Sequence, residues 1–139
     1  MGGRPGAQRI GPPVNVTTPA AWVAIAVGAV LGAWARWVLG LALNRPGQAL
    51  PWGTLAVNVA GGLLVGMALA WFERHPEAEA VWRPLLVTGF LGALTTFSTF
   101  SGESIALIQR GAWGAALLHS AAHLAGAIGA TALGWRLLR

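Results

Sequence analysis

The chain has 139 residues, of which 55% are apolar and only 9% are charged. Soluble domains average about 25% charged residues, so this chain is predicted to lie in lipid rather than in water. Its nine basic residues are all arginine and form no patch, which argues against nucleic-acid binding, and the absence of cysteine excludes disulfides and thiolate sites.

Residues 1–19 are rich in glycine and proline and are predicted to form a flexible tail. A bilayer core requires about 20 apolar residues per helix. Four segments within residues 20–139 meet this requirement, at about 20–43, 53–72, 84–109 and 112–135. A turn-forming stretch at 44–47 ends the first segment, and the charged stretch 73–83 must leave the membrane. The sequence therefore predicts an all-α membrane protein with four transmembrane helices.

Two patterns in these segments bear on assembly. Glycines recur four residues apart, as at Gly28 and Gly32 or Gly62 and Gly66, a spacing that lets helices approach closely in lipid. We interpret it as packing within one bundle rather than as a dedicated dimer seam. The arginines are nearly balanced between the two sides of the membrane, so the chain is able to insert both ways. Two opposed copies would then form an antiparallel dimer, which would supply the wall that four short helices lack.

The third segment contains a stretch that is unusually polar for lipid. Residues 89–103 hold three glycines, five hydroxyl residues and a terminal carboxylate, Glu103. Irregular backbone persists in a membrane only where it lines a cavity or contacts protein. Broken helices of this kind supply exposed carbonyls and half-helix ends as ion ligands in transporters. We therefore expect a discontinuous, ion-handling third helix.

Aromatic and hydroxyl side chains share this stretch. Phe97 and Phe100 are three residues apart and so lie on one helix face, where ring edges are able to line the path of a small anion. Packing against lipid is the alternative. The hydroxyl residues suggest polar contacts between helices or a hydrated ion path. Hydrogen bonds to carbonyls one turn back account for some of these hydroxyls. These hydroxyl residues are Thr95, Thr96, Ser98, Thr99 and Ser101.

Polar residues in the other segments leave alternatives open. Asn58 has an amide that either donates to an anion or forms an interhelical hydrogen bond. Arg36 and Glu103 would each cost about 2.5–3.5 kcal/mol at the bilayer centre, so we expect them to face water or a partner. His119 and His123 are four apart and form a possible metal pair with the distant Glu103, but a polar wall or interhelical bonding is favoured.

Three motifs resemble the small bacterial fluoride channels, the Fluc family, and the resemblance covers residues 20–139. They are Gly32-Ala33-Trp34-Ala35-Arg36-Trp37, Gly53-Thr54-Leu55-Ala56-Val57-Asn58, and residues 89–103 with the core Thr95-Thr96-Phe97-Ser98-Thr99-Phe100. The resemblance implies a channel, not an enzyme, that exports cytoplasmic fluoride passively across the inner (plasma) membrane. It also implies an antiparallel, dual-topology homodimer with two pores. The choice of fluoride over chloride comes from the resemblance alone.

The resemblance also implies roles for individual residues. Phe97 and Phe100 would meet fluoride edge-on, and Asn58 would donate a hydrogen bond to it. The backbone carbonyls of Gly92 and Thr95, two per subunit, would hold a structural Na⁺ at the dimer centre. The remaining expected site residues are Thr96, Ser98, Thr99 and His123 in the pore and Arg36 and Glu103 in a vestibule.

The fourth segment departs from the family pattern. His119 and His123, followed one turn later by Ala127, stand near positions where relatives often carry tyrosine and serine. Because imidazole titrates near neutrality, we hypothesise pH-sensitive conduction. Two alternatives remain at this point. A proton-coupled small multidrug exporter would need a carboxylate in the first segment, where Arg36 is the only charge, and an intramembrane metalloenzyme would use His119, His123 and Glu103.

Overall fold

A computed structural model of the chain describes residues 18–44, 48 and 50–139, and this part of the chain contains helices but no strand. In chain order the elements are α1 (Pro19–Leu43), α2 (Trp52–Arg74), α3 (Pro76–Arg83), the π-helical segment η1 (Pro84–Leu91), α4 (Gly92–Leu94), α5 (Phe97–Gln109) and α6 (Trp113–Leu138). The Thr18 hydroxyl accepts a hydrogen bond from the Ala21 N–H at 3.3 Å and so caps α1. The expected flexible tail otherwise lies outside the described residues.

Four helical stretches are long and apolar enough to cross a membrane: Pro19–Leu43, Trp52–Arg74, Pro84–Gln109 and Trp113–Leu138. The prediction of an all-helical chain with four membrane-spanning segments is therefore confirmed. The structure places the last residue of α2 at Arg74 and that of α6 at Leu138. Both helices thus continue into polar residues, because arginine is a good helix former and the membrane boundary does not itself end a helix.

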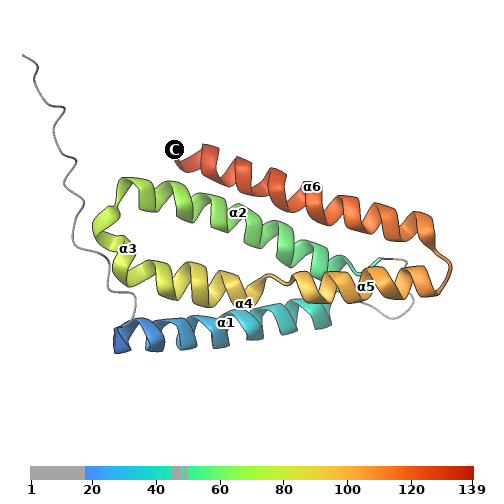
Figure 1. Cartoon of the computed structure of the whole chain (residues 1–139), viewed down its shortest axis with the longest axis horizontal. Helices are drawn as coiled ribbons and strands as arrows, with labels where there is room; N and C mark the ends of the chain where they lie inside the picture. The colour runs from blue at the N-terminus through green and yellow to red at the C-terminus, as the bar shows by residue number, and fades with distance from the viewer. Residues whose placement is uncertain (1–17, 45–47, 49) are drawn as a thin grey trace, which may run out of the picture.

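A short helix that the sequence analysis did not assign connects α2 to the third span. In α3, Glu77 and Glu79 lie in the first turn and Arg83 in the last, an arrangement that complements the helix dipole. Glu79 and Arg83 also form an ion pair along the helix. Figure 1 shows α3 at the end of the bundle, where it links the spanning helices.

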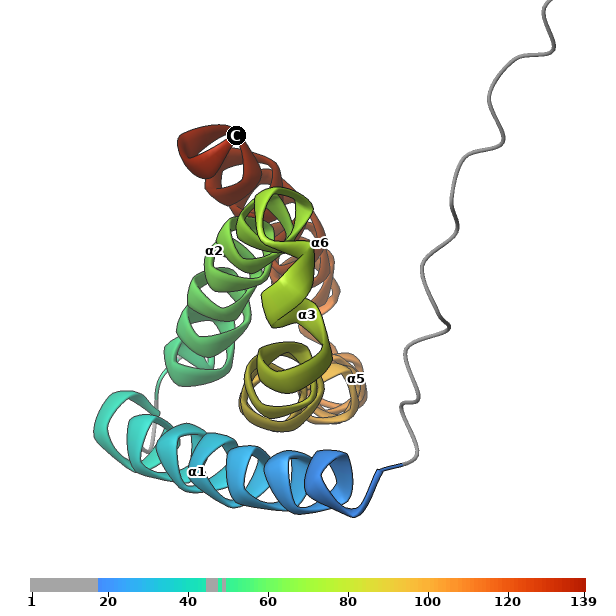
Figure 2. The ribbon, with the colours of Figure 1, turned by 90° about the vertical axis from the view of Figure 1, so that its left-hand side faces the viewer.

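The spanning helices form two closely packed pairs. Helix α2 lies along α6, and α1 lies against η1 and α4 (Figures 1 and 2). Glycine permits each contact: a Cβ added to Gly32 would lie 2.1 Å from the Phe90 carbonyl oxygen, and one added to Gly66 would lie 2.0 Å from that of Thr131. Small residues four apart therefore serve packing within the chain, as expected.

The molecule has few buried apolar side chains and many exposed ones. Val57, Leu91 and Leu94 form the buried cluster, whereas large apolar residues along α1 and α6 are exposed. Six tryptophans are about half exposed or more. In lipid, helix association depends on close packing rather than on burying apolar surface, so this distribution suits a bilayer.

Candidate functional site

The site forms where the helical backbone is interrupted between α4 and α5. Thr95 (φ −79°, ψ 153°) and Thr96 (φ −151°, ψ 113°) are both extended. The Thr95 hydroxyl donates to the Leu91 carbonyl at 2.9 Å, and the Thr96 hydroxyl oxygen accepts from the Thr99 N–H at 3.1 Å. Thr96 is thus the N-cap of α5. An extended pair within a membrane span needs partners for its backbone groups.

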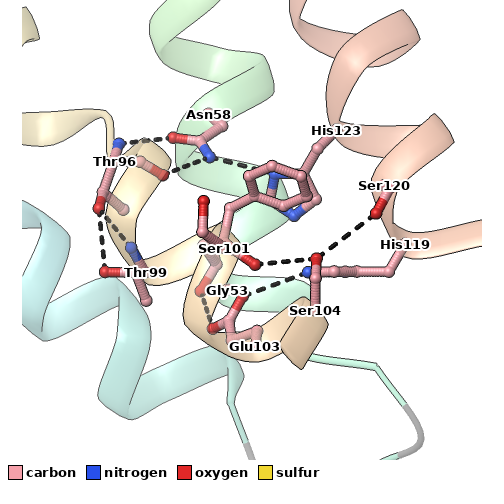
Figure 3. Close-up of polar contacts among 12 residues, drawn as sticks. Gly53, Asn58, Thr96, Thr99, Ser101, Glu103, Ser104, His119, Ser120 and His123 are labelled. Atoms are coloured by element: carbon pink, nitrogen blue, oxygen red, sulfur yellow. Dashed lines mark hydrogen bonds and ion pairs between the residues drawn. The ribbon is translucent and has the colours of Figure 1, made fainter. Parts of the chain in front are cut away.

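Asn58 of α2 supplies those partners (Figure 3). Its Oδ1 accepts from the Thr96 N–H at 2.8 Å, and its Nδ2 donates to the Thr96 carbonyl at 3.0 Å. The second hydrogen of Nδ2 faces His123 Nδ1 at 3.1 Å. Both the oxygen acceptor and the nitrogen donor of the Asn58 amide are therefore engaged in hydrogen bonds. Of the two readings of Asn58, the interhelical hydrogen bond is present in this structure.

The interruption also changes the backbone before it. In a continuous α-helix the Thr96 N–H would donate to the Gly92 carbonyl four residues earlier, but here it donates to Asn58. Gly92 is exposed, and Thr95, half-buried, is extended. The carbonyls of Gly92 and Thr95 are the two that the sequence analysis expected to hold a structural cation. Both therefore belong to a stretch of backbone that lacks the regular hydrogen bonds of a helix. Unwound carbonyls of this kind are suitable ligands for Na⁺.

Aromatic rings and imidazoles stack beside the interruption. Phe97 and Phe100 have ring centroids 5.3 Å apart at an interplanar angle of 64°, so an edge of one ring meets a face of the other. Phe100 stacks on His123 at 4.7 Å and 26° and also contacts His119 at 5.5 Å. Phe97 is 79% exposed. The two rings thus differ: Phe100 is held by α6, and Phe97 projects from the chain.

A pocket of about 560 Å³ brings most of the predicted pore residues together. Its polar lining comes from the interruption, from α2 and from α6. The residues named in the sequence analysis that line it are Asn58, Gly62, Thr95, Thr96, Phe97, Phe100, His123 and Ala127. Ser98 lies beside it, with its hydroxyl 3.3 Å from that of Thr96. Ser120 also lines it and was not singled out, because a lone serine on an apolar helix gives no signal.

A second hollow, of about 380 Å³, lies on the other side of Thr96. Arg36, Thr54 and Thr99 line it together with Thr96, which therefore borders both spaces. The two residues expected in a vestibule are in different surroundings: Arg36 borders this hollow, and Glu103 points toward α2 and α6. Glu103 Oε1 accepts from the Thr54 hydroxyl at 2.5 Å, and its Oε2 lies 3.5 Å from His119 Nε2.

The hydroxyl cluster has two uses in the structure. Thr95 and Ser101 donate to carbonyls one turn back, on Leu91 and Phe97, which is the local bonding considered for some of them. Thr96, Ser98 and Thr99 instead contact one another around the cap of α5. The dense run of hydroxyls therefore both stabilises α5 and lines the pocket.

Apolar spans around a polar interruption and a pocket define a multi-pass membrane protein with an internal site of small-ligand size. The chain belongs to the family described as CrcB-like protein, Camphor Resistance (CrcB), which it matches over residues 23–135.

Three relatives illustrate the similarity, each named fluoride-specific ion channel FluC. That of Aromatoleum aromaticum is 55% identical over 108 residues, or 78% of this chain and 82% of the relative. That of Cupriavidus metallidurans is 53% identical over 84% of this chain and 92% of the relative. That of Bordetella pertussis is 50% identical over 87% of this chain and 93% of the relative. These names give no support to a multidrug exporter or a metalloenzyme.

Proposed function

We propose that the protein is a fluoride-specific ion channel that releases cytoplasmic fluoride passively across the inner (plasma) membrane. The relatives at 50–55% identity carry that name. The structural observation that carries the proposal is the meeting of Asn58, Phe97 and Phe100 in one pocket at an extended backbone segment. Passage of an ion makes and breaks no covalent bond, so the protein is not an enzyme.

The pocket offers an anion several weak donors rather than one strong cation. The edges of Phe97 and Phe100 carry partial positive charge, and α5 begins at Phe97 with its first-turn amides toward the interruption. Both hydrogens of the Asn58 amide are engaged, one by Thr96 and one by His123. Fluoride that reaches Asn58 therefore takes the place of His123 Nδ1. The hydrogen bond passes from the imidazole to the ion.

The working unit is an antiparallel, dual-topology homodimer. Phe97 is 79% exposed in a single chain, so one wall of its path has to come from elsewhere. A second, inverted copy would supply that wall, and the near-equal arginine distribution permits both orientations. Crosslinking in liposomes tests this assembly. A chain that conducts fluoride as a monomer would contradict it.

A structural Na⁺ at the dimer centre fits the donor set of Gly92 and Thr95. Their two carbonyl oxygens form part of a coordination shell, and the same two from the second copy would add to it. The cation would supply positive charge that holds the two interruptions together. Replacing Na⁺ by N-methyl-glucamine is expected to lower the thermal stability of the dimer in detergent. Unchanged stability and assembly would rule out this role.

Fluoride efflux from liposomes that contain the purified protein tests the function directly. We expect fluoride efflux well above that of protein-free liposomes and little chloride efflux. Replacing both Phe97 and Phe100 by alanine should abolish the fluoride signal. A well-folded dimer without fluoride-selective efflux would overturn the proposal.

A further inference from the structure

A second polar cluster lies between α5 and α6, beyond the Phe100 ring from Asn58. Among the described residues, three buried side-chain atoms have no hydrogen-bond partner: Glu103 Oε2, His119 Nε2 and His123 Nε2. Each of these three residues offers a ligand atom within 4.8 Å of the other two. His119 and His123 are only 2% and 4% exposed. Buried polar atoms without a hydrogen-bond partner are costly, so three of them on residues whose ligand atoms lie this close together point to a ligand that the three residues would share.

We propose that Glu103, His119 and His123 form a binding site for a borderline transition-metal dication such as Zn²⁺. Two imidazoles and one carboxylate are a common ligand set for this ion. Bonds of about 2.0–2.1 Å in tetrahedral geometry require ligand atoms roughly 3.3 Å apart. Glu103 Oε2 and His119 Nε2 already lie 3.5 Å apart, and His123 has a ligand atom within 4.8 Å of theirs, so it would have to move closer to complete the set. The Glu103 carboxylate also offsets part of the dication's charge in a membrane span.

The outer contacts of the cluster orient two of the ligands. The Thr54 hydroxyl donates to Glu103 Oε1 at 2.5 Å and leaves Oε2 directed at the histidines. The His119 ring contacts the Phe100 ring, with centroids 5.5 Å apart, which restricts the orientation of this imidazole. His123 lines the pocket of about 560 Å³, which gives an ion a route to the cluster.

His123 makes metal binding compete with the Asn58 contact. The Asn58 amide cannot turn over, because Thr96 engages both its oxygen and its nitrogen. Nδ2 can only donate, so His123 Nδ1 must accept, and the imidazole proton is on Nε2. A metal at Nε2 displaces that proton and leaves a neutral imidazole with its proton on Nδ1, facing the Asn58 hydrogens. The metal-bound state therefore separates His123 from Asn58.

We expect a bound dication to slow efflux for a different reason. It joins α5 to α6 beside Phe100 and immobilises His123, and both of these residues line the pocket. The inhibitory effect rests on the proposed channel function, whereas metal binding does not. A direct binding measurement therefore tests the metal site, and a flux measurement tests the inhibition. Either claim can be refuted without the other.

Titration of the purified full-length chain with Zn²⁺, followed by calorimetry, tests binding. We expect one ion per chain and at least tenfold weaker binding after His119→Ala, His123→Ala or Glu103→Gln. His75→Ala is the matched control, because His75 is the remaining histidine and stacks on Trp71 away from the cluster. Equal binding by the wild type and His119→Ala, or loss of binding in His75→Ala, would overturn the site.

Two further measurements keep the test valid if a ligand variant fails to fold. Co²⁺ added to the wild type should give the intense visible absorption of a four-coordinate nitrogen and oxygen site, and a weak octahedral spectrum would exclude it. Thr54→Val keeps all three ligands but frees Glu103 Oε1, and we expect weaker Zn²⁺ binding by several-fold.

In liposomes, Zn²⁺ should reduce fluoride efflux by the wild type and by His75→Ala but not by His119→Ala. Full efflux at saturating Zn²⁺ would refute the inhibition while leaving the binding result intact.

Discussion

The two halves of α6 contact the rest of the chain in different ways. Near its C-terminal end, Thr131 and Gly134 lie so close to α2 that a Cβ on Gly134 would be 2.1 Å from the Leu63 carbonyl oxygen. Near its N-terminal end, His119 and Ser120 face Glu103 and Ser104 of α5, and His123 faces Asn58 of α2 beside a pocket. One helix thus has a tightly packed half and a polar half, and the pocket lies beside the polar half and reaches Thr131 at the edge of the packed half. The packed half fixes α6 in place, and the polar half carries the residues proposed to handle ions.

The largest expected effect comes from breaking the packed half. Gly66→Val places a side chain where a Cβ would already lie 2.0 Å from the Thr131 carbonyl oxygen, and backbone cannot yield as a flexible side chain does. We expect a loss of at least about 3 kcal/mol, the upper end of ordinary overpacking, and little folded protein by size-exclusion chromatography. Gly129→Ala is the control, because its added Cβ meets open space and should be tolerated. Normal yield and efflux from Gly66→Val would show that this contact is not required.

The next effect comes from removing the amide that connects the polar half to α2. Asn58→Leu leaves the N–H and carbonyl of the buried Thr96 unpaired, at about 1–3 kcal/mol for each group. Thermal unfolding in detergent should show this loss, and fluoride efflux should disappear. Leu64→Ala, on the exposed side of the same helix, should change neither. Stability equal to wild type would mean that Thr96 finds other partners.

A smaller effect is expected within the polar half itself. Phe100→Ala removes ring contacts with both His119 and His123, worth about 0.5–1.5 kcal/mol each beyond burial. We expect a modest fall in melting temperature and at least tenfold slower fluoride efflux. Ile105→Ala, an exposed apolar position on the same helix, is the control. If both variants slow efflux equally, the effect is not specific to the ring.

The smallest expected effect is on the pH dependence of efflux. Protonating His123 puts a hydrogen on Nδ1, which then faces the hydrogens of Asn58 Nδ2. The contact is therefore present at high pH and lost as His123 is protonated, which frees the Asn58 hydrogen that fluoride has to take. We expect slightly faster protein-dependent efflux at pH 5.5 than at pH 8. Glu103 and His119 also face this region and titrate. His123→Asn, which keeps an acceptor toward Asn58, isolates the part due to His123 and should flatten the profile. Protein-free liposomes correct for hydrogen fluoride that crosses lipid unaided, and equal flux across this range would exclude a pH switch.

The sequence predicts the four spans well and the contacts between them poorly. Hydropathy and helix length depend on neighbours in the chain, so the spans could be recognised without a structure. Asn58 and Thr96 are 38 positions apart, and Thr54 and Glu103 are 49 apart. Nothing local marks these pairs. The sequence therefore leaves the role of Asn58 open and does not identify Thr54 as a partner of Glu103. The short helix α3 was also missed, because a charged connector looks the same in helical and irregular form.

The contact between Asn58 and residue 96 has a consequence for how this site tolerates change. Asn58 binds the main-chain N–H and carbonyl of Thr96, and these atoms are present in almost every amino acid. This bond therefore constrains position 58 by side-chain chemistry and position 96 by backbone shape alone, apart from the role of the Thr96 hydroxyl as the cap of α5. Serine or valine at position 96 would keep the bond, whereas proline would remove its N–H. Substitutions at the two positions need not compensate each other, so we expect this coupling to leave little trace in paired sequence variation.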